Sequence, residues 1–143
     1  MPGNTKPFPG VVELIQQLHN EGFKVSICTN KKEALARKLL SFFDFGADFS
    51  AITGGDSFEY RKPDPRHILS TIELSKCVRD NTVMVGDSIS DIDAAKSANV
   101  PVIGVSFGYT DVPISDLKPD LVINHYKELT IAKIDALMQR LSS

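Results

Sequence analysis

The sequence predicts a three-layer α/β fold, in which a parallel sheet is covered by helices on both faces. Short, nearly uninterrupted apolar runs alternate with segments of helical periodicity, as in sheets whose strands are buried on both faces. No internal repeat or second domain boundary interrupts this alternation, and 143 residues suffice for one compact core. We therefore expect an irregular, proline-rich lead-in over residues 1–9 and one core domain over residues 10–143.

The first part of the chain contains two helix–strand units. Apolar residues at the spacing i, i+3, i+4, i+7 predict the first helix, and Gly22 is suited to a left-handed cap after it. These apolar residues are Val11, Leu14, Ile15 and Leu18. A β-prone run over residues 23–29 predicts the first strand. The second helix is indicated by Leu35, Leu39 and Phe42, and a second strand is expected over residues 49–53.

The remaining chain continues the alternation. Asp64 and Pro65 predict a helix start, with Asp64 as cap and Pro65 in the first turn. Ser90 with Asp93 resembles a capping box and predicts the start of the next helix there. Further apolar positions mark the inner faces of three helices: Ile68, Leu69 and Ile72; Ala94, Ala95 and Ala98; and Ile134, Leu137, Met138 and Leu141. Three more strands are expected, over residues 82–86, 101–105 and 120–123.

Composition excludes several classes of partner. The formal net charge is −2, and the 16 basic residues are scattered, so we expect no nucleic-acid partner. No apolar run approaches the ~18–20 residues of a membrane span, so we expect no membrane partner. Cys28 and Cys77 lie in apolar patterns, which suggests buried thiols in a reducing cytoplasm rather than a disulfide or a nucleophile.

Polar residues stand after two predicted strands and just before one predicted helix, at the sheet edge where α/β folds bind ligands. They are Thr29, Asn30, Lys62, Asp87 and Asp91. Each alone has an ordinary explanation: Thr29 as a helix cap, Lys62 as a solvated loop lysine, and the two aspartates as turn and first-turn residues. Together, a hydroxyl at a helix start, a lysine and two carboxylates suit phosphate and Mg²⁺ binding.

Three segments resemble the second, third and fourth motifs of the haloacid dehalogenase superfamily. They are CTNK (28–31), RKPDP (61–65) and GDSISDIDAAKSA (86–98). Four more resemble the phosphoglycolate phosphatases of that superfamily: residues 7–18, 54–56, 105–110 and 118–123. The resemblance implies a Rossmann-like core and Mg²⁺-dependent hydrolysis of a small phosphorylated metabolite, with 2-phosphoglycolate as the expected substrate. Asn99 stands where relatives usually have glycine, and both residues tolerate a left-handed cap.

The same resemblance implies a role for each polar residue. Thr29 would bind the transferring phosphoryl group and Asn30 would help to orient it. Lys62 would stabilise the charge on nucleophile and phosphate. Asp87 would bind Mg²⁺ directly or through water, while Asp91 would position Lys62 or a metal-bound water.

The first motif of the superfamily, DxDG followed by Thr or Val, does not occur in the sequence. Its first aspartate would be the nucleophile that forms an aspartyl-phosphate, and its second the general acid and base. The nearest look-alike, Asp91-Ile92-Asp93, belongs to the fourth motif. The helical cap domain of the phosphoglycolate phosphatases is absent too. We therefore expect the C-terminal portion of a longer phosphatase, inactive by itself.

The strand that carries the first motif would lie between the strands ending at Thr29 and Asp87. Without it, we expect these two strands either to pair directly or to accommodate another segment or chain, which would permit self-association. We favour the second outcome.

Other functions remain open at this point. The chain could be a non-catalytic phosphate- or partner-binding module, or belong to another phosphatase, pyrophosphatase or mutase of the superfamily. A response-regulator receiver domain is excluded, because its acidic residues precede its Thr and Lys, whereas the order here is Thr29, Lys62, Asp87.

Overall fold

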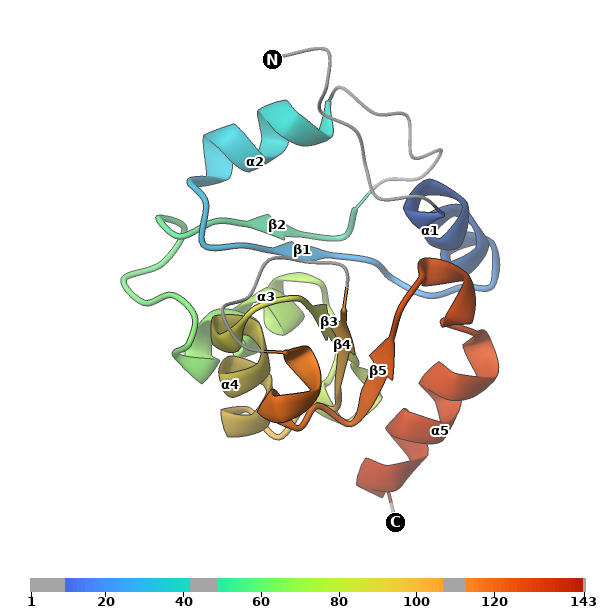
Figure 1. The fold of residues 1–143 in the computed structure, drawn as a ribbon. Helices are drawn as coiled ribbons and strands as arrows, with labels where there is room; N and C mark the ends of the chain where they lie inside the picture. Colours follow the sequence, from blue (N-terminus) through green and yellow to red (C-terminus); the bar gives the residue numbers. More distant parts are fainter. Residues whose placement is uncertain (1–9, 42–48, 107–112, 143) are drawn as a thin grey trace.

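Helices and short strands alternate throughout the computed structural model, which describes residues 10–41, 49–106 and 113–142 (Figure 1). The helices are α1 (Val11–Asn20), α2 (Glu33–Leu40), α3 (Pro65–Leu74), α4 (Ile89–Ser97) and α5 (Ile131–Ser142). The strands are β1 (Ile27–Cys28), β2 (Ile52–Thr53), β3 (Met84–Gly86), β4 (Val102–Val105) and β5 (Leu121–Ile123). Three 3-10 turns complete the described elements: η1 (Arg79–Asn81), η2 (Ile114–Leu117) and η3 (Tyr126–Glu128). The lead-in over residues 1–9 and Phe42 lie outside the described residues.

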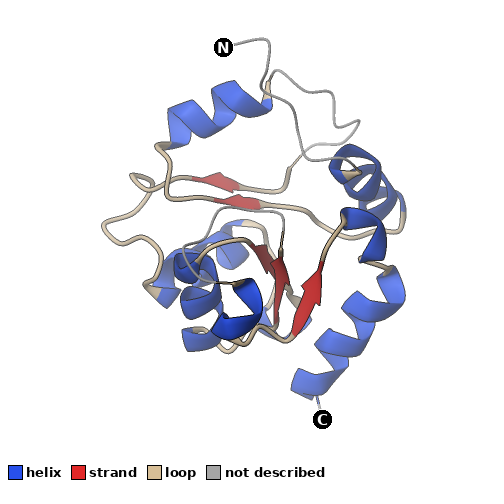
Figure 2. Cartoon of the chain, in the orientation of Figure 1, coloured by secondary structure: helices blue, strands red, loops and turns tan. Residues whose placement is uncertain are grey.

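All five expected strands are present, although each is shorter than predicted, and every strand pair is parallel. The pairs form two separate groups, β1 with β2 and β3 with β4 and β5 (Figure 2). Within the described ranges β1 and β3 do not pair with each other. Direct closure of these two strands, the first expected outcome, is therefore not what the structure shows, and the α/β fold with parallel strands is confirmed.

Helix α4 begins earlier than its sequence suggested. Its N-cap is Ser88, whose Oγ accepts a hydrogen bond from the main-chain N–H of Asp91 at 3.2 Å. The predicted capping box of Ser90 and Asp93 is therefore wrong. The reason is that β3 ends at Gly86 and the chain turns at once, which leaves Ser88 as the extended residue before the first turn.

Other helix ends agree with the sequence. The Asp64 side chain accepts from the N–H of Arg66, and Pro65 opens α3. Gly22 follows α1 at φ 88°, and Asn99 follows α4 at φ 58°, both left-handed. Asn99 thus adopts the conformation that glycine would take most easily.

The buried face of α3 differs from the predicted one. Ile68 and Ile72 are buried as expected, but Leu69 is 37% exposed. The buried stripe is completed by the polar residues His67 and Thr71, one position before each isoleucine. A similar shift occurs in α2, where Ala36 is buried and Leu35 is exposed. The hydropathy pattern therefore predicted the wrong buried face for both α2 and α3.

The helices cover the β3–β5 sheet from two sides, so that two apolar clusters form (Figure 1). One cluster joins α3 and α4 to the sheet, through residues such as Ile68, Ile92 and Val102. The other joins the sheet to α5, through Ile123 and Ile134, with α1 packed beside it. The strand ends between these layers are thereby held in place.

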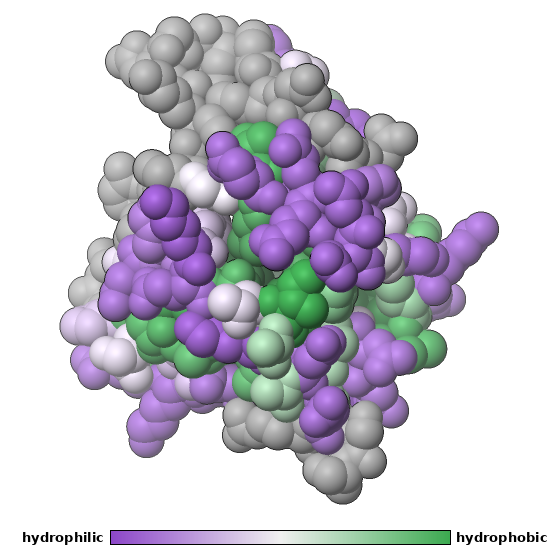
Figure 3. Space-filling model, turned by 90° about the vertical axis from the view of Figure 1, so that its right-hand side faces the viewer, coloured by the Kyte–Doolittle hydropathy of each residue, from purple (hydrophilic) through white to green (hydrophobic). Residues whose placement is uncertain are grey.

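None of the described helices is both long enough and apolar enough to span a bilayer. The face shown in Figure 3 carries mostly hydrophilic side chains with apolar residues showing between them. Such scattered apolar exposure is ordinary for a folded protein surface.

Helix α4 offers a matched test of the core. Ile92 is completely buried, whereas Ile89 on the same helix is 42% exposed. We expect Ile92→Ala to lower the free energy of unfolding by about 2–5 kcal/mol, because it leaves a cavity. Ile89→Ala should cost less than about 1 kcal/mol. Urea unfolding of both variants measures this, and equal losses would contradict the placement of α4.

Candidate active site

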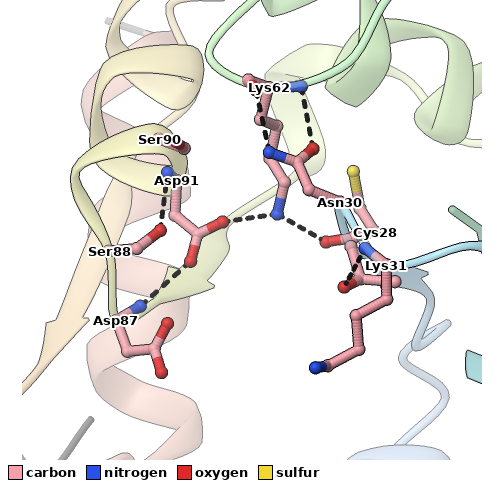
Figure 4. A pocket seen from close by; sticks show the side chains of 9 residues that line it. Cys28, Asn30, Lys31, Lys62, Asp87, Ser88, Ser90 and Asp91 are labelled. Atoms are coloured by element: carbon pink, nitrogen blue, oxygen red, sulfur yellow. Dashed lines mark hydrogen bonds and ion pairs between the residues drawn. The ribbon is translucent and has the colours of Figure 1, made fainter. Parts of the chain in front are cut away.

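A polar cavity of about 490 Å³ lies at the carboxyl ends of β1 and β3 (Figure 4). Its lining consists of Cys28, Thr29, Asn30, Lys31, Lys62, Asp87, Ser88, Ser90 and Asp91. All five residues singled out from the sequence are among them. Three separate loops, after β1, before α3 and after β3, therefore bring them to one place.

The side chain of Lys62 makes the central contacts in the lining of this cavity. It is only 6% exposed, so it is not a solvated loop lysine. Its Nζ donates to the main-chain oxygen of Cys28 at 2.7 Å and forms an ion pair with Oδ1 of Asp91. The ammonium group therefore links the end of β1 to the first turn of α4 (Figure 4).

The main chain of Lys62 is held by Asn30. Asn30 Nδ2 donates to the carbonyl oxygen of Lys62 at 2.8 Å, and its Oδ1 accepts from the N–H of Lys62 at 3.1 Å. Both atoms of this side-chain amide are thus engaged. The loop after β1 and the loop before α3 are locked together by a paired contact.

Asp91 is engaged through both carboxylate oxygens. Oδ1 meets Lys62, and Oδ2 accepts from the main-chain N–H of Asp87 at 3.1 Å. Gly86 permits this approach, since a Cβ at that position would come within 2.4 Å of the Cβ of Asp91. Of the two roles expected for Asp91, the geometry matches contact with Lys62.

Asp87 has a different environment. Burial raises the pKa of its carboxyl group above the usual value, and the charge of Asp91 raises it further. Among the described residues no ion pair involves the Asp87 carboxylate. A hard cation at this position would offset the cost of its negative charge.

The two carboxylates fit part of a magnesium site. Their oxygen atoms are the ligand type that Mg²⁺ prefers, and one or two carboxylates with water and substrate phosphate are a usual ligand set. Across the described part of the chain, no group of three His, Cys, Asp or Glu residues is placed to hold a metal ion. Of the two expected metal ligands, Asp91 is paired with Lys62, whereas the Asp87 carboxylate forms no ion pair with the described residues and is the freer candidate.

Thr29 does not cap α2. The N-cap of that helix is Lys32, which makes no side-chain capping bond. Oγ1 of Thr29 instead accepts from the N–H of Lys31 at 3.2 Å, within the loop that lines the cavity. In that bond the hydroxyl oxygen is the acceptor, so the hydroxyl proton stays available to a bound oxyanion.

Cys28 has the properties of a spectator thiol. Burial raises the pKa of its thiol, which opposes the reactive thiolate form. What Cys28 contributes is the main-chain oxygen that accepts from Lys62.

Sequence reasoning missed some residues near the cavity. Lys31, Ser88 and Ser90 line it, and Ser88 also caps α4. The position of Ser88, directly after the strand-ending Gly86-Asp87, was a signal that could have identified it. Tyr126 in η3 gave no such signal, although burial and then the charge of Asp87 raise the pKa of its hydroxyl.

Comparisons with known proteins agree on one family. Residues 3–105 match the family described as haloacid dehalogenase-like hydrolase. A phosphoglycolate phosphatase of Agrobacterium fabrum is 49% identical over 98% of this chain, and one of Mesorhizobium japonicum is 42% identical over 97%. The crystal structure of a predicted phosphoglycolate phosphatase from Haemophilus somnus superimposes with a TM-score of 0.83 at 30% identity, covering 91% of this chain and 57% of that one. The chain spans 60% and 61% of the length of the two curated relatives.

The raised pKa of Asp87 makes a stability prediction. A raised pKa means that the folded state favours the protonated carboxyl group of Asp87. The stabilisation that this group contributes is therefore fully present below about pH 4 and is lost as the pH rises through the folded pKa. Without a divalent cation, Asp87→Asn should therefore stabilise the chain at pH 7 by up to about 1 kcal/mol, a modest gain because the group is partly solvated.

This gain should disappear near pH 4. Urea unfolding in EDTA at both pH values measures it, with Asp93→Asn on the exposed side of α4 as control. A loss of stability on Asp87→Asn at pH 7 would contradict the cost assigned to this charge.

Proposed function

Because this chain belongs to the haloacid dehalogenase-like hydrolase family, we propose that it forms the phosphate- and metal-binding part of a Mg²⁺-dependent phosphate-ester hydrolase. One observation carries the proposal: a single polar cavity contains a threonine hydroxyl, a buried lysine and two aspartates at the ends of parallel strands. Figure 4 shows the Lys62 ammonium group between Asp91 and the main-chain oxygen of Cys28, with Asp87 beside Asp91.

The proposed substrate is a small phosphorylated metabolite, with 2-phosphoglycolate as the first candidate. Support comes from the names of the two curated relatives, each called phosphoglycolate phosphatase, which this chain matches over nearly its whole length. The cavity volume of about 490 Å³ falls in the range of small-molecule sites.

In this proposal Thr29 binds a phosphoryl oxygen through its hydroxyl proton. Lys62 stabilises the negative charge that develops at phosphorus and its neighbours, because Nζ already lies at the cavity wall. Asn30 holds that lysine through Nδ2 and Oδ1, and the second proton of Nδ2 stays available to help orient a phosphoryl oxygen.

Asp87 would hold Mg²⁺, directly or through water, and Asp91 would keep Lys62 in position. When bound, the cation supplies positive charge to the phosphate oxygens. Lys62 is paired with Asp91 and not with Asp87, so the Asp87 carboxylate is available to the metal in this proposal.

The reaction is proposed to pass through an aspartyl-phosphate whose nucleophile is outside this chain. The carboxylate would attack phosphorus, the alcohol would leave with a proton from an acid, and water would then hydrolyse the acyl phosphate. Asp91-Ile92-Asp93 does not fit this role. It lies within α4, with Asp91 paired to Lys62, Ile92 buried and Asp93 exposed.

We propose that a segment of a second chain, or of a lost N-terminal fragment, occupies the position between β1 and β3. Among the described strands, β1 pairs only with β2 and β3 only with β4, so each has one edge without a described partner. Such edges would also permit self-association of the chain. We further propose a reducing cytoplasm, because Cys28 and Cys77 are both free thiols.

The second candidate is a binding module without catalysis, which the same cavity would also suit. Thr29 and Lys62 in its lining could bind an oxyanion without turnover. Another phosphatase, pyrophosphatase or mutase of the family remains a third assignment, since the core residues do not select the substrate.

For the isolated 143-residue chain we expect no turnover of 2-phosphoglycolate, because charge stabilisation without a nucleophile cannot cleave the ester. Phosphate release in the presence of Mg²⁺ is the measurement. Robust hydrolysis by pure protein, unchanged on repurification, would show that the nucleophile lies within this chain.

A chimera distinguishes the enzyme from the binding module. This chain would replace the matching segment of the Agrobacterium fabrum relative, which supplies the remainder. We expect Mg²⁺-dependent hydrolysis of 2-phosphoglycolate, reduced roughly 100-fold or more by Lys62→Met because charge stabilisation is lost. Lys38→Met, at an exposed position of α2, is the matched control and should change little. A folded chimera without activity would favour the binding module.

A further inference from the structure

His67 is a buried imidazole for which the proposed chemistry has no use. It lies in α3 and is 0% exposed. Its ring contacts the main chain of Lys62 on one side and the side chain of Thr53 in β2 on the other. A histidine is a costly residue to bury unless both ring nitrogens find partners.

The contact with Lys62 determines the tautomer of His67. The main-chain N–H of Lys62 points at Nδ1 of the ring at 3.2 Å. An N–H group can only donate, so Nδ1 must be an unprotonated acceptor. The neutral ring then carries its proton on Nε2, which lies 3.2 Å from Oγ1 of Thr53.

Two buried threonines complete a closed set of hydrogen bonds. Oγ1 of Thr53 lies 2.7 Å from Oγ1 of Thr71, and Thr71 donates to the carbonyl oxygen of His67 at 2.7 Å. Thr71 spends its one proton on His67, so Thr53 donates to Thr71, a shorter contact than its 3.5 Å to the main-chain oxygen of Ile27, and His67 Nε2–H donates to Thr53. Thr53 is 1% and Thr71 4% exposed, so water does not compete with these bonds.

The neutral state of the ring is favoured on independent grounds. Burial lowers the pKa of His67, and the positive charge of Lys62 lowers it further. An imidazolium would place a proton on Nδ1, where the N–H of Lys62 already points. The hydrogen-bond geometry and the charge environment therefore agree.

We propose that His67 is a positioning residue for Lys62, with Nδ1 fixing the lysine main chain so that its ammonium group meets Cys28 and Asp91. The N–H of Lys62 is shared between His67 Nδ1 and Asn30 Oδ1, so it is held from α3 and from the loop after β1. This role rests on the proposed phosphate site, because that site gives the position of the ammonium group its importance.

Two variants distinguish the proposed positioning role of His67 from a role in which its ring only fills space. His67→Asn keeps an acceptor near the Nδ1 position but leaves a cavity. His67→Leu keeps most of the volume but removes the acceptor. Positioning requires His67→Leu to be the more damaging change at Lys62, whereas space filling requires His67→Asn to be.

The first experiment is nitrogen NMR on the 143-residue chain at neutral pH. We expect the Nε2–H tautomer of His67, and an Nδ1–H tautomer or an imidazolium would overturn the proposal. Amide hydrogen exchange then compares the variants. We expect the Lys62 amide to exchange about tenfold faster in His67→Leu and within about threefold of wild type in His67→Asn.

Thr53→Val is a second, nearly isosteric variant outside α3. It removes the acceptor for Nε2–H, so we expect the Nδ1–H tautomer to become populated and exchange of the Lys62 amide to accelerate. Unchanged exchange in both Thr53→Val and His67→Leu would overturn the proposal.

Titration with inorganic phosphate in the presence of Mg²⁺ separates this inference from the proposed function. We expect His67→Leu to weaken phosphate binding about tenfold and His67→Asn to change it less than about threefold. If phosphate does not bind even to wild type, the proposed function fails. The difference in Lys62 amide exchange between His67→Leu and His67→Asn still decides whether His67 positions Lys62. Equal weakening in the two variants would overturn the positioning role.

Discussion

The buried ion pair between Lys62 and Asp91 is the interaction on which the site depends. It joins the loop before α3 to the first turn of α4, while the same ammonium group reaches the last carbonyl of β1. The described strands provide no pairing between the two sheets at this place. Charges buried to this degree are tolerated only as well-bonded partners, so loss of either residue would leave the other uncompensated. Asn30 and His67 then serve to keep the lysine main chain where this pair can form.

Much of the architecture could be predicted because its causes are local. Apolar runs and helical spacing identified all five strands and helices, and Asp64-Pro65 marked the start of α3. The site residues were found by a geometric rule, since parallel strands place their carboxyl ends on one edge, where Thr29 and Asp87 then lie together. Their roles in phosphate and metal binding are proposals that chemistry supports.

What the sequence did not reveal depends on contacts between distant segments. His67 looks like an ordinary helix residue until the loop before α3 folds back and places the Lys62 N–H over its ring. Leu69 fits the apolar spacing of α3, yet the helix is rotated so that His67 and Thr71 face Thr53 instead. The cap of α4 was misplaced for a related reason, because the residue at which β3 ends decides whether Ser88 or Ser90 is the last extended one. Among the described strands β1 and β3 do not pair, whereas the sequence left direct pairing open, because strand pairing depends on contacts between distant segments.

Gly86 has a consequence for the substitutions that this fold can accept. A Cβ there would come within 2.4 Å of the Cβ of Asp91 and 2.8 Å of its Oδ2, so even alanine would push the carboxylate from its place. The strand and the helix cannot relax independently, since α4 is fixed by its packing in the apolar cluster around Ile92. The residue type at position 86 is thus dictated by the first turn of the neighbouring helix and not by the needs of the strand that contains it.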